Sequence, residues 1–337
     1  MNVLVKGVGV AGLAVAVELA SRGMAITVTD HRPSLEGSAS WFAGGMLAPW
    51  CECESAEQAV FDLGRSASDW WEAALPGHVR RHGTLVVAPL RDAGELARFA
   101  DRTMDGATWL DEEGIARLEP ALAGRFRQGL FFPGEAHLDP REALVGLQQD
   151  LAGRGVRFLL GRSDVVPADN DFDRVVDCTG SGAVGKMQGL RGVRGEMLYL
   201  HSTEITLSRP VRLLHPRYPL YVVPRAAGRF MVGATMIESE DNGPMAVRSL
   251  MELLNAAYAL HPAFAEARLM ETGTGIRPAF ADNFPRVSVD ADAIRVNGLY
   301  RHGFLLAPAM AGEAAAVLAR EAGRLDAPPQ NQRRAFR

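Results

Sequence analysis

The N-terminal part of the chain alternates between short apolar runs and one longer apolar stretch. Residues 2–6 and 25–29 are short and rich in β-branched side chains, which is typical of buried strands, whereas residues 10–22 are rich in Ala and Leu and predict a helix. Gly23 stands where a helix C-cap is expected, and the turn that follows is short, as parallel crossover units require. The pattern therefore predicts a βαβ unit.

Two kinds of strand are predicted further along the chain. Residues 156–160, 174–178 and 294–297 are short apolar runs, typical of a buried parallel sheet. From 194 to 233 strands are predicted at 197–201, 220–223 and 229–232. Turns separate them, which indicates an antiparallel sheet and a candidate substrate domain. Asp139 is well placed to cap the helix predicted from Pro140. The other predicted elements are helices at 56–71, 94–102, 140–152 and 312–320 and strands at 84–89 and 129–132.

Composition excludes some classes of partner. The 337 residues are 47% hydrophobic and 23% charged, and the formal net charge of -4 provides no strong field for nucleic acid or an anionic membrane. No run of about 18 uncharged apolar residues occurs, so we expect no membrane-spanning helix and a cytoplasmic protein.

Cys51, Cys53 and Cys178 are too few for a disulfide framework. Because Cys51 and Cys53 lack a second Cys or His pair, we expect no metal site.

A G-x-G-x-x-G motif lies between the first predicted strand and helix. Gly7 allows the tight turn, Gly9 lets a pyrophosphate approach the backbone, and Gly12 lets helix and strand pack closely. The phosphates would then meet unpaired N–H groups at the start of the helix. Asp30, at the end of the second strand, could accept hydrogen bonds from ribose hydroxyls, which disfavours NADP. These residues predict a dinucleotide site and leave FAD and NAD open; the alternative is a glycine-rich turn that binds no dinucleotide.

Two later segments favour FAD. Residues 173–182 form a strand that ends in a small-residue turn, like the late strand that flavoproteins place beside the nucleotide. Residues 301–312 form a Gly-containing loop that leads into a helix, whose amides could face the pyrimidine edge of a flavin and favour its negative charge when reduced.

Taken together, these segments resemble the D-amino acid oxidase family of FAD enzymes, and most closely its glycine oxidase branch, which serves thiamin biosynthesis in many bacteria. The resemblance covers nearly the whole chain. Its carriers are the glycine motif at 7–12, AGGMLAP at 43–49, YVVPR at 221–225, VGATM at 232–236, IRP at 276–278 and GFLLAP at 303–308.

The resemblance implies FAD as the cofactor, with residues 43–46 lining the flavin, where two glycines permit a close approach of the backbone. The strand at Val156 would contact the adenine side. The motif and the resemblance together give these expected cofactor contacts: Gly7, Gly9, Val10, Ala11, Gly12, Asp30, His31, Ala43, Gly44, Gly45, Met46, Val156, Thr179, Gly180, Arg277, His302, Gly303, Phe304, Leu305 and Leu306.

The resemblance also implies a substrate site. Arg277 matches the arginine that forms a bidentate pair with the substrate carboxylate, and Tyr221 matches a tyrosine that helps hold it. Met236 would form an apolar wall, and Arg301 would lie near the flavin and the active-site entrance. Each of the four also fits an ordinary packing or surface role. Many glycine oxidases carry a His where this chain has Pro219, which leaves the amine specificity open.

The resemblance implies an α/β fold with a discontinuous Rossmann-like FAD-binding domain, because the flavin site uses the beginning, middle and end of the chain. We predict this domain at 1–80, 138–193 and 272–330, with a second domain on a mainly antiparallel sheet at 81–137 and 194–271. Residues 331–337 are predicted to be a polar tail.

The implied reaction is oxidative deamination of glycine or a small amine-bearing acid, with oxygen as acceptor, for the thiazole branch of thiamin biosynthesis. Alternatives are a D-amino acid or sarcosine-type oxidase, a dehydrogenase that passes electrons to another carrier, and a non-catalytic dinucleotide-binding protein. The expected partners are an amino acid and oxygen, and a homo-oligomer is left open.

Overall fold

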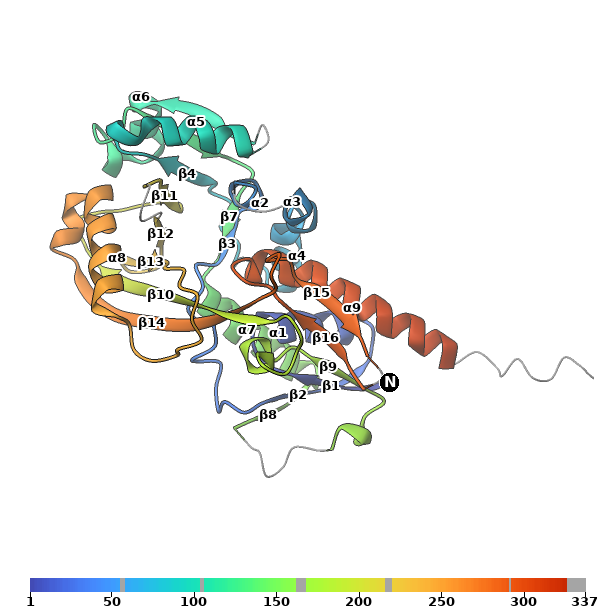
Figure 1. Cartoon of the computed structure of the whole chain (residues 1–337). Helices are drawn as coiled ribbons and strands as arrows, with labels where there is room; N and C mark the ends of the chain where they lie inside the picture. The colour runs from blue at the N-terminus through green and yellow to red at the C-terminus, as the bar shows by residue number, and fades with distance from the viewer. Residues whose placement is uncertain (55–57, 104–105, 162–167, 216–219, 291, 326–337) are drawn as a thin grey trace, which may run out of the picture.

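The computed structural model describes residues 1–54, 58–103, 106–161, 168–215, 220–290 and 292–325, and the statements below concern these residues. Pro219 and the predicted tail at 331–337 lie outside them. The chain forms two main sheets, one at the bottom of Figure 1 and the other above and to the left of it.

The first sheet confirms the predicted βαβ unit and its later additions. Its strand order is β15-β16-β9-β1-β2-β8, and all neighbours are parallel except β15 and β16. The strands are β1 (Asn2–Lys6), β2 (Ala25–Asp30), β8 (Arg157–Leu160), β9 (Arg174–Asp177), β15 (Arg286–Val289) and β16 (Ile294–Asn297). The three short apolar runs predicted far apart in the sequence therefore join one Rossmann-like sheet.

Three helices pack around this sheet: α1 (Val10–Ala20), α7 (Pro140–Gly153) and α9 (Gly303–Leu325). Asp139 caps α7 as predicted, because its Oδ1 accepts the backbone N–H of Arg141 at 2.9 Å. By length and composition α9 could cross a membrane, but more than half of its most apolar window is buried, and it packs directly on α1. Burial in the core accounts for its apolar character.

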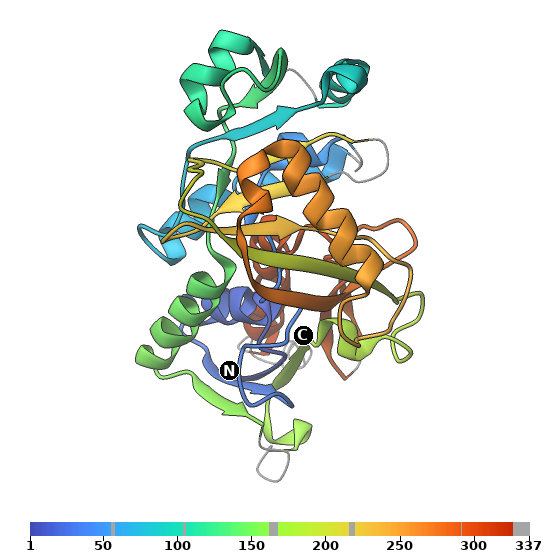
Figure 2. The ribbon, with the colours of Figure 1, turned by 90° about the vertical axis from the view of Figure 1, so that its left-hand side faces the viewer.

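The second sheet has the strand order β14-β10-β13-β12-β11-β4-β6-β5. Its neighbours are antiparallel except for β11 and β4. The strands are β4 (Thr84–Val87), β5 (Thr108–Asp111), β6 (Gln128–Phe132), β10 (Arg191–His201), β11 (Val211–Leu213), β12 (Leu220–Pro224), β13 (Arg229–Gly233) and β14 (Arg268–Ala279). Helix α8 (Val247–Leu260) covers one face, as Figure 2 shows, and α5 (Ala93–Arg102) and α6 (Glu112–Leu118) lie at the β5 end.

Two long strands depart from the sequence prediction. The strand expected at 197–201 is only the end of β10, and β14 was not predicted as a strand. The two pair along their lengths, from Arg191 opposite Ala279 to His201 opposite Arg268. The predicted domain boundaries at 193/194 and 271/272 fall inside these strands, and the domain division stays a prediction.

The helix predicted at 56–71 is two helices in the structure, α3 (Gln58–Gly64) and α4 (Ala67–Ala74). Gly64 packs on α9, where a Cβ would lie 2.7 Å from Cγ of Leu305, so the chain turns at this contact. The remaining elements lie where the two sheets meet: α2 (Pro49–Glu52) and a two-stranded pair of β3 (Met46–Leu47) and β7 (Ala136–His137).

The turn between β1 and α1 generates a stability prediction. A Cβ on Gly12 would lie 1.9 Å from the carbonyl oxygen of Gly7, which backbone cannot accommodate without moving. We expect Gly12→Ala to lower the free energy of unfolding by about 3 kcal/mol or more in denaturant melts. In the control Gly312→Ala, also within a helix, the Cβ meets nothing within 4 Å. It should be neutral or stabilise by up to about 1 kcal/mol; equal losses in both variants would contradict the packing argument.

Candidate active site

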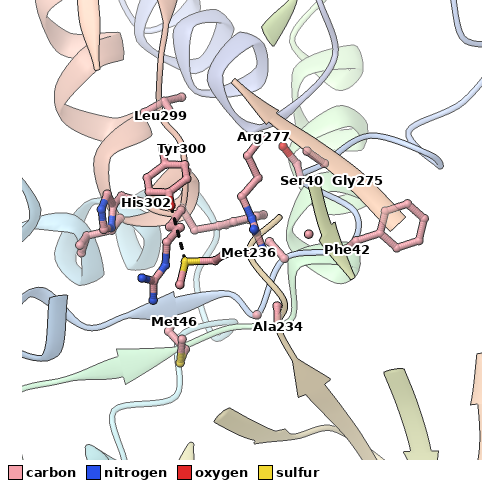
Figure 3. Close-up of a pocket in the computed structure, with 18 of the residues that line it drawn as sticks. Ser40, Phe42, Met46, Ala234, Met236, Gly275, Arg277, Leu299, Tyr300 and His302 are labelled. Carbon is pink, nitrogen blue, oxygen red and sulfur yellow. Dashed lines mark hydrogen bonds between the residues drawn. The ribbon is translucent and has the colours of Figure 1, made fainter. Parts of the chain in front are cut away.

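A cavity of about 510 Å³ lies where the two sheets meet. Its walls come from the start of α1, the segment 38–46, the strands β10, β12 and β14, and the loop that precedes α9. Figure 3 shows side chains from these distant segments converging on one space. The cavity thus draws on the beginning, middle and end of the chain.

The glycine motif forms the wall at the start of α1. Gly7 has φ of 104°, and a Cβ there would lie 2.4 Å from the carbonyl oxygen of Cys178, so the tight turn needs glycine. Gly9, Val10 and Ala11 line the cavity. The first N–H groups of a helix have no partner within it, so this wall offers donors to an anion such as a pyrophosphate. The residues present therefore fit the phosphates of a dinucleotide.

Ser40 is a candidate cofactor residue that sequence reasoning missed. It lines the cavity, and its Oγ accepts the N–H of Val10 at 3.0 Å. The only signal in the sequence was its place in a stretch rich in Gly, Ser and Ala. Its hydroxyl lies at the helix terminus where a phosphate oxygen would bind.

Asp30 lies beside the cavity but does not line it. Its side chain is 3% exposed and accepts the N–H of Val8 at 2.9 Å and Nη2 of Arg32 at 2.7 Å. Burial would raise the pKa of Asp30, but the hydrogen bonds from Arg32 and Val8 lower it below its ordinary value. Arg32 does line the cavity. The ionised carboxylate of Asp30 and the guanidinium of Arg32 therefore lie together at the predicted ribose position. The neighbouring His31 is exposed.

Most of the other expected cofactor residues are brought together by the structure. Those that line the cavity are Gly9, Val10, Ala11, Ala43, Gly44, Gly45, Met46, Thr179, Gly180, Arg277, His302, Gly303, Phe304 and Leu305. Those outside its lining are Gly7, Gly12, Asp30, His31, Val156 and Leu306. Direct contact of these residues with the cofactor stays a prediction.

The two glycines of the flavin segment have packing roles. A Cβ on Gly44 would lie 2.8 Å from Cε2 of Tyr221. Gly45 has φ of 70°, and its Cβ would lie 2.3 Å from the carbonyl oxygen of Leu138, next to the start of α7. The structure shows that these glycines let Tyr221 and the start of α7 approach the backbone. Their predicted role in a close approach to the flavin stays a prediction.

Arg277 extends from β14 into the cavity, as Figure 3 shows. Its Nη1 donates a hydrogen bond to the carbonyl oxygen of Thr235 at 3.0 Å. The guanidinium lies over Gly195 of β10, where a Cβ would be 2.2 Å from Cζ. Burial lowers the pKa of Arg277, but an arginine guanidinium in a protein stays protonated. A cation with donors to spare, on a cavity wall next to Tyr221, is suited to bind a carboxylate.

Met236 and Tyr300 meet on another side of the cavity. The hydroxyl of Tyr300 contacts Sδ of Met236 at 3.5 Å, the contact that Figure 3 draws as a dashed line. Met236 is 49% exposed and also lines the cavity, so it lies at the edge of the predicted substrate space. Sequence reasoning missed Tyr300, whose only signal was its position beside Arg301.

The start of α9 forms the last wall. The loop predicted at 301–312 is wrong beyond residue 302, because the helix begins at Gly303. Gly303, Phe304 and Leu305 line the cavity, and Nε1 of Trp71 donates to the carbonyl oxygen of Phe304 at 2.8 Å, which fixes the first turn. Arg301 and His302 precede the helix and line the cavity too. A helix N-terminus beside a cation favours negative charge, which suits the pyrimidine end of a flavin.

Two buried charged residues on the cavity wall, Glu52 and Arg212, were also missed, because they match none of the sequence motifs described above.

Among the described residues, no three His, Cys, Asp or Glu side chains are grouped to hold a metal ion. Cys51 and Cys178 are buried, and Sγ of Cys53 contacts the carbonyl oxygen of Pro49 at 3.4 Å.

Comparison with known families gives a match over residues 2–317 to the model described as DAO, FAD dependent oxidoreductase. The chain belongs to this family. FAD is therefore its cofactor, and the cavity is the site whose residues fit it. The α/β fold and the predicted class of flavin-dependent oxidoreductase are confirmed.

Several proteins are similar to this family member. It is 63% identical over 323 residues to a protein of Rhizobium etli named as a thiamine biosynthesis oxidoreductase, ThiO, with 96% of this chain and 98% of that protein covered. It is 25% identical to the glycine oxidase of Bacillus subtilis, covering 91% and 89% of the two chains. The solved glycine oxidase of Bacillus cereus matches with a TM-score of 0.80 at 22% identity, covering 95% of both chains, a likeness of fold.

The contact between Gly195 and Arg277 generates a second prediction. In Gly195→Ala the new methyl group must displace the guanidinium, so carboxylate binding should weaken while FAD stays bound. We expect the Kd of acetate, followed by its effect on flavin absorbance, to rise about tenfold or more, since hydrogen bonds to charged groups contribute about 1.5–3 kcal/mol. An unchanged Kd would show that Arg277 does not bind the carboxylate.

Glu135 generates a prediction on pH. It is 1% exposed, and burial raises its pKa from 4.5 to about 7, although hydrogen bonds, including one from the N–H of Cys51, oppose the rise. The folded state therefore holds a proton that the unfolded state releases at lower pH, so this group's contribution to stability falls as pH rises from 4.5 through about 7.

Glu135→Gln removes that ionisation. We expect the variant to gain stability relative to the parent protein as pH rises over this range, by up to about 3 kcal/mol. Denaturant melts at pH 5 and pH 8 measure the difference in free energy of unfolding between the variant and the parent protein. If this difference is the same at both pH values, the raised pKa of Glu135 is refuted.

Proposed function

We propose that the protein catalyses FAD-dependent oxidation of glycine, or of a similarly small amino acid, to the 2-oxo acid, ammonia and hydrogen peroxide. We further propose that the reaction serves the thiazole branch of thiamin biosynthesis in the cytoplasm. The name of the Rhizobium etli relative and the activity of the more distant glycine oxidases support both proposals. The observation that carries the proposal is the Arg277 guanidinium, held over Gly195 on a wall of the FAD cavity.

The residues of this chain would act mainly by orientation. Arg277 would hold the substrate carboxylate in a bidentate pair, and the hydroxyl of Tyr221, packed against Gly44, would support it. FAD held between the start of α1 and the start of α9 would supply the two-electron redox chemistry, with oxygen as the final acceptor. With the carboxylate fixed, the Cα–H bond of a small substrate can be presented to the flavin in one geometry.

Met236 and Tyr300 favour a small substrate. Their contact at 3.5 Å closes one side of the space beside Arg277. A larger amino acid side chain would have to separate them. Glycine has no such side chain, which makes it the first substrate to test.

The direct test is to mix the flavin-loaded protein anaerobically with glycine, sarcosine and D-alanine in turn. We expect glycine to bleach the flavin absorbance, and readmitted oxygen to give hydrogen peroxide in amounts matching the 2-oxo acid. Failure of all three would refute the proposal. If glycine bleaches the flavin but no peroxide forms, an electron acceptor other than oxygen reoxidises the flavin.

Arg277→Ala tests the residue that carries the argument. Losing a bidentate ion pair should raise the glycine concentration needed for half-maximal flavin reduction at least about a hundredfold, about 2.7 kcal/mol. Arg248→Ala, which removes an exposed arginine on α8, is the matched control and should behave as the parent protein. An Arg277→Ala protein with unchanged glycine dependence would contradict the assigned role.

A further inference from the structure

Glu52 is a buried carboxylate on the wall of the FAD cavity. It ends the short helix α2, directly after the flavin segment, and is 6% exposed. Arg212 of β11, and Arg301 and His302 from the loop before α9, approach it. All four side chains line the same cavity, although they come from three separate parts of the sequence.

The two oxygens of Glu52 have different partners. Oε1 forms an ion pair with Nη2 of Arg212. Oε2 lies 3.2 Å from Nδ1 of His302 and 3.9 Å from Nη2 of Arg301. Oε1 therefore forms the ion pair with Arg212, and Oε2 faces Arg301 and His302, the two residues that precede α9.

Both sides of this contact carry a buried polar atom without a hydrogen-bond partner among the described residues. Within the part of the chain that the structure describes, Oε2 of Glu52 and Nδ1 of His302 are buried and have no aligned hydrogen-bond partner. Buried polar atoms are costly without a partner, and such atoms on a cavity wall indicate a site that is completed when a ligand binds. The contact between Glu52 and His302 needs only a small reorientation to become a hydrogen bond.

Arg212 keeps Glu52 charged. Burial would raise the pKa of Glu52, but the nearby charges of Arg212 and Arg301 bring its pKa well below its ordinary value. Glu52 is therefore an anion that can hold a guanidinium. One carboxylate set against two arginines leaves one positive charge facing the cavity.

We infer that Glu52 is a positioning residue that holds Arg301, beside His302, against the flavin at the start of α9, with Arg212 as its counter-ion. This inference rests on the proposed position of the flavin. Arg301 is 24% exposed in its side chain and ends a long flexible stem, so its place beside the ring depends on what holds its guanidinium. Glu52 does this from α2, the helix that follows the flavin segment, so this helix contributes to the charge at the pyrimidine end of the flavin.

The test measures the Kd of FAD for the apoprotein and the midpoint potential of the bound flavin in four proteins: parent, Glu52→Gln, Arg301→Ala and the double variant. We expect Glu52→Gln to weaken FAD binding about tenfold and to lower the potential, because a loosened Arg301 stabilises the reduced, anionic flavin less well. In the Arg301→Ala background the same substitution should change the Kd less than about twofold and leave the potential unchanged, because Glu52 acts through Arg301.

Two results would overturn the inference. A rise in potential would mean that Glu52 acts only through its own negative charge. Equal effects of Glu52→Gln in both backgrounds would mean that it does not act through Arg301. Glu135→Gln is the matched control: Glu135 is as deeply buried and lies near Arg212, yet it does not line the cavity. It should leave Kd and potential unchanged at pH 8.

Glu52→Gln leaves Arg212 buried without a counter-ion, which can cost about 3–5 kcal/mol and prevent folding. The variant Glu52→Gln/Arg212→Gln removes both charges and is the alternative. If it folds, binds FAD and keeps the parent potential, the inference is wrong; a lowered potential supports it. None of these measurements uses glycine, so failure of the proposed reaction and failure of this inference are separate outcomes.

Discussion

The antiparallel pairing of β10 with β14 is the constraint on which the site depends. The two strands run side by side from Arg191 opposite Ala279 to His201 opposite Arg268, and they form one edge of the eight-stranded sheet. Pairing places Val193 opposite Arg277 and Gly195 opposite Gly275, so the arginine can fold over a glycine on the neighbouring strand. A register shift of one residue would turn Arg277 to the other face of the sheet, away from the cavity.

Two helix N-termini reach the same cavity from different parts of the chain. The glycine motif lies at the turn into α1, and Arg301 and His302 lie in the loop just before α9. The two helices pack on one another, so their ends are held in a fixed relation. The cavity can thus favour negative charge at two places, one suited to phosphates and the other to the pyrimidine end of a flavin.

Buried charge is grouped around the join between the two sheets. Glu52 and Arg212 connect α2 with β11, and Glu135 accepts the N–H of Cys51 from the same helix. These groups differ in their ionisation, because Glu52 is surrounded by cations, whereas burial dominates at Glu135. Ionised Glu52 and Glu135, whose pKa is about 7, therefore lie in one region between the two sheets, and of the two only Glu52 lines the cofactor cavity.

Much of the architecture could be predicted from the sequence. The periodicity of β1, α1 and β2, the three glycines and the Asp139 cap are local signals, and the structure confirms the βαβ unit and the cap. The resemblance carried by short motifs identified the family and FAD, which the family match confirms. Strand β14 was missed because it lies at the edge of its sheet and is partly exposed, so it lacks a strong apolar pattern.

The amino-acid sequence by itself determined the local elements, the phosphate-binding turn and the family. Only the tertiary structure decided that Arg32 covers Asp30, that Gly44 receives Tyr221, and that Glu52 meets Arg212, Arg301 and His302. Periodicity and short motifs report interactions between residues close in the sequence. These contacts join residues far apart along it, or depend on which oxygen or which face of a side chain is left free once the chain has packed.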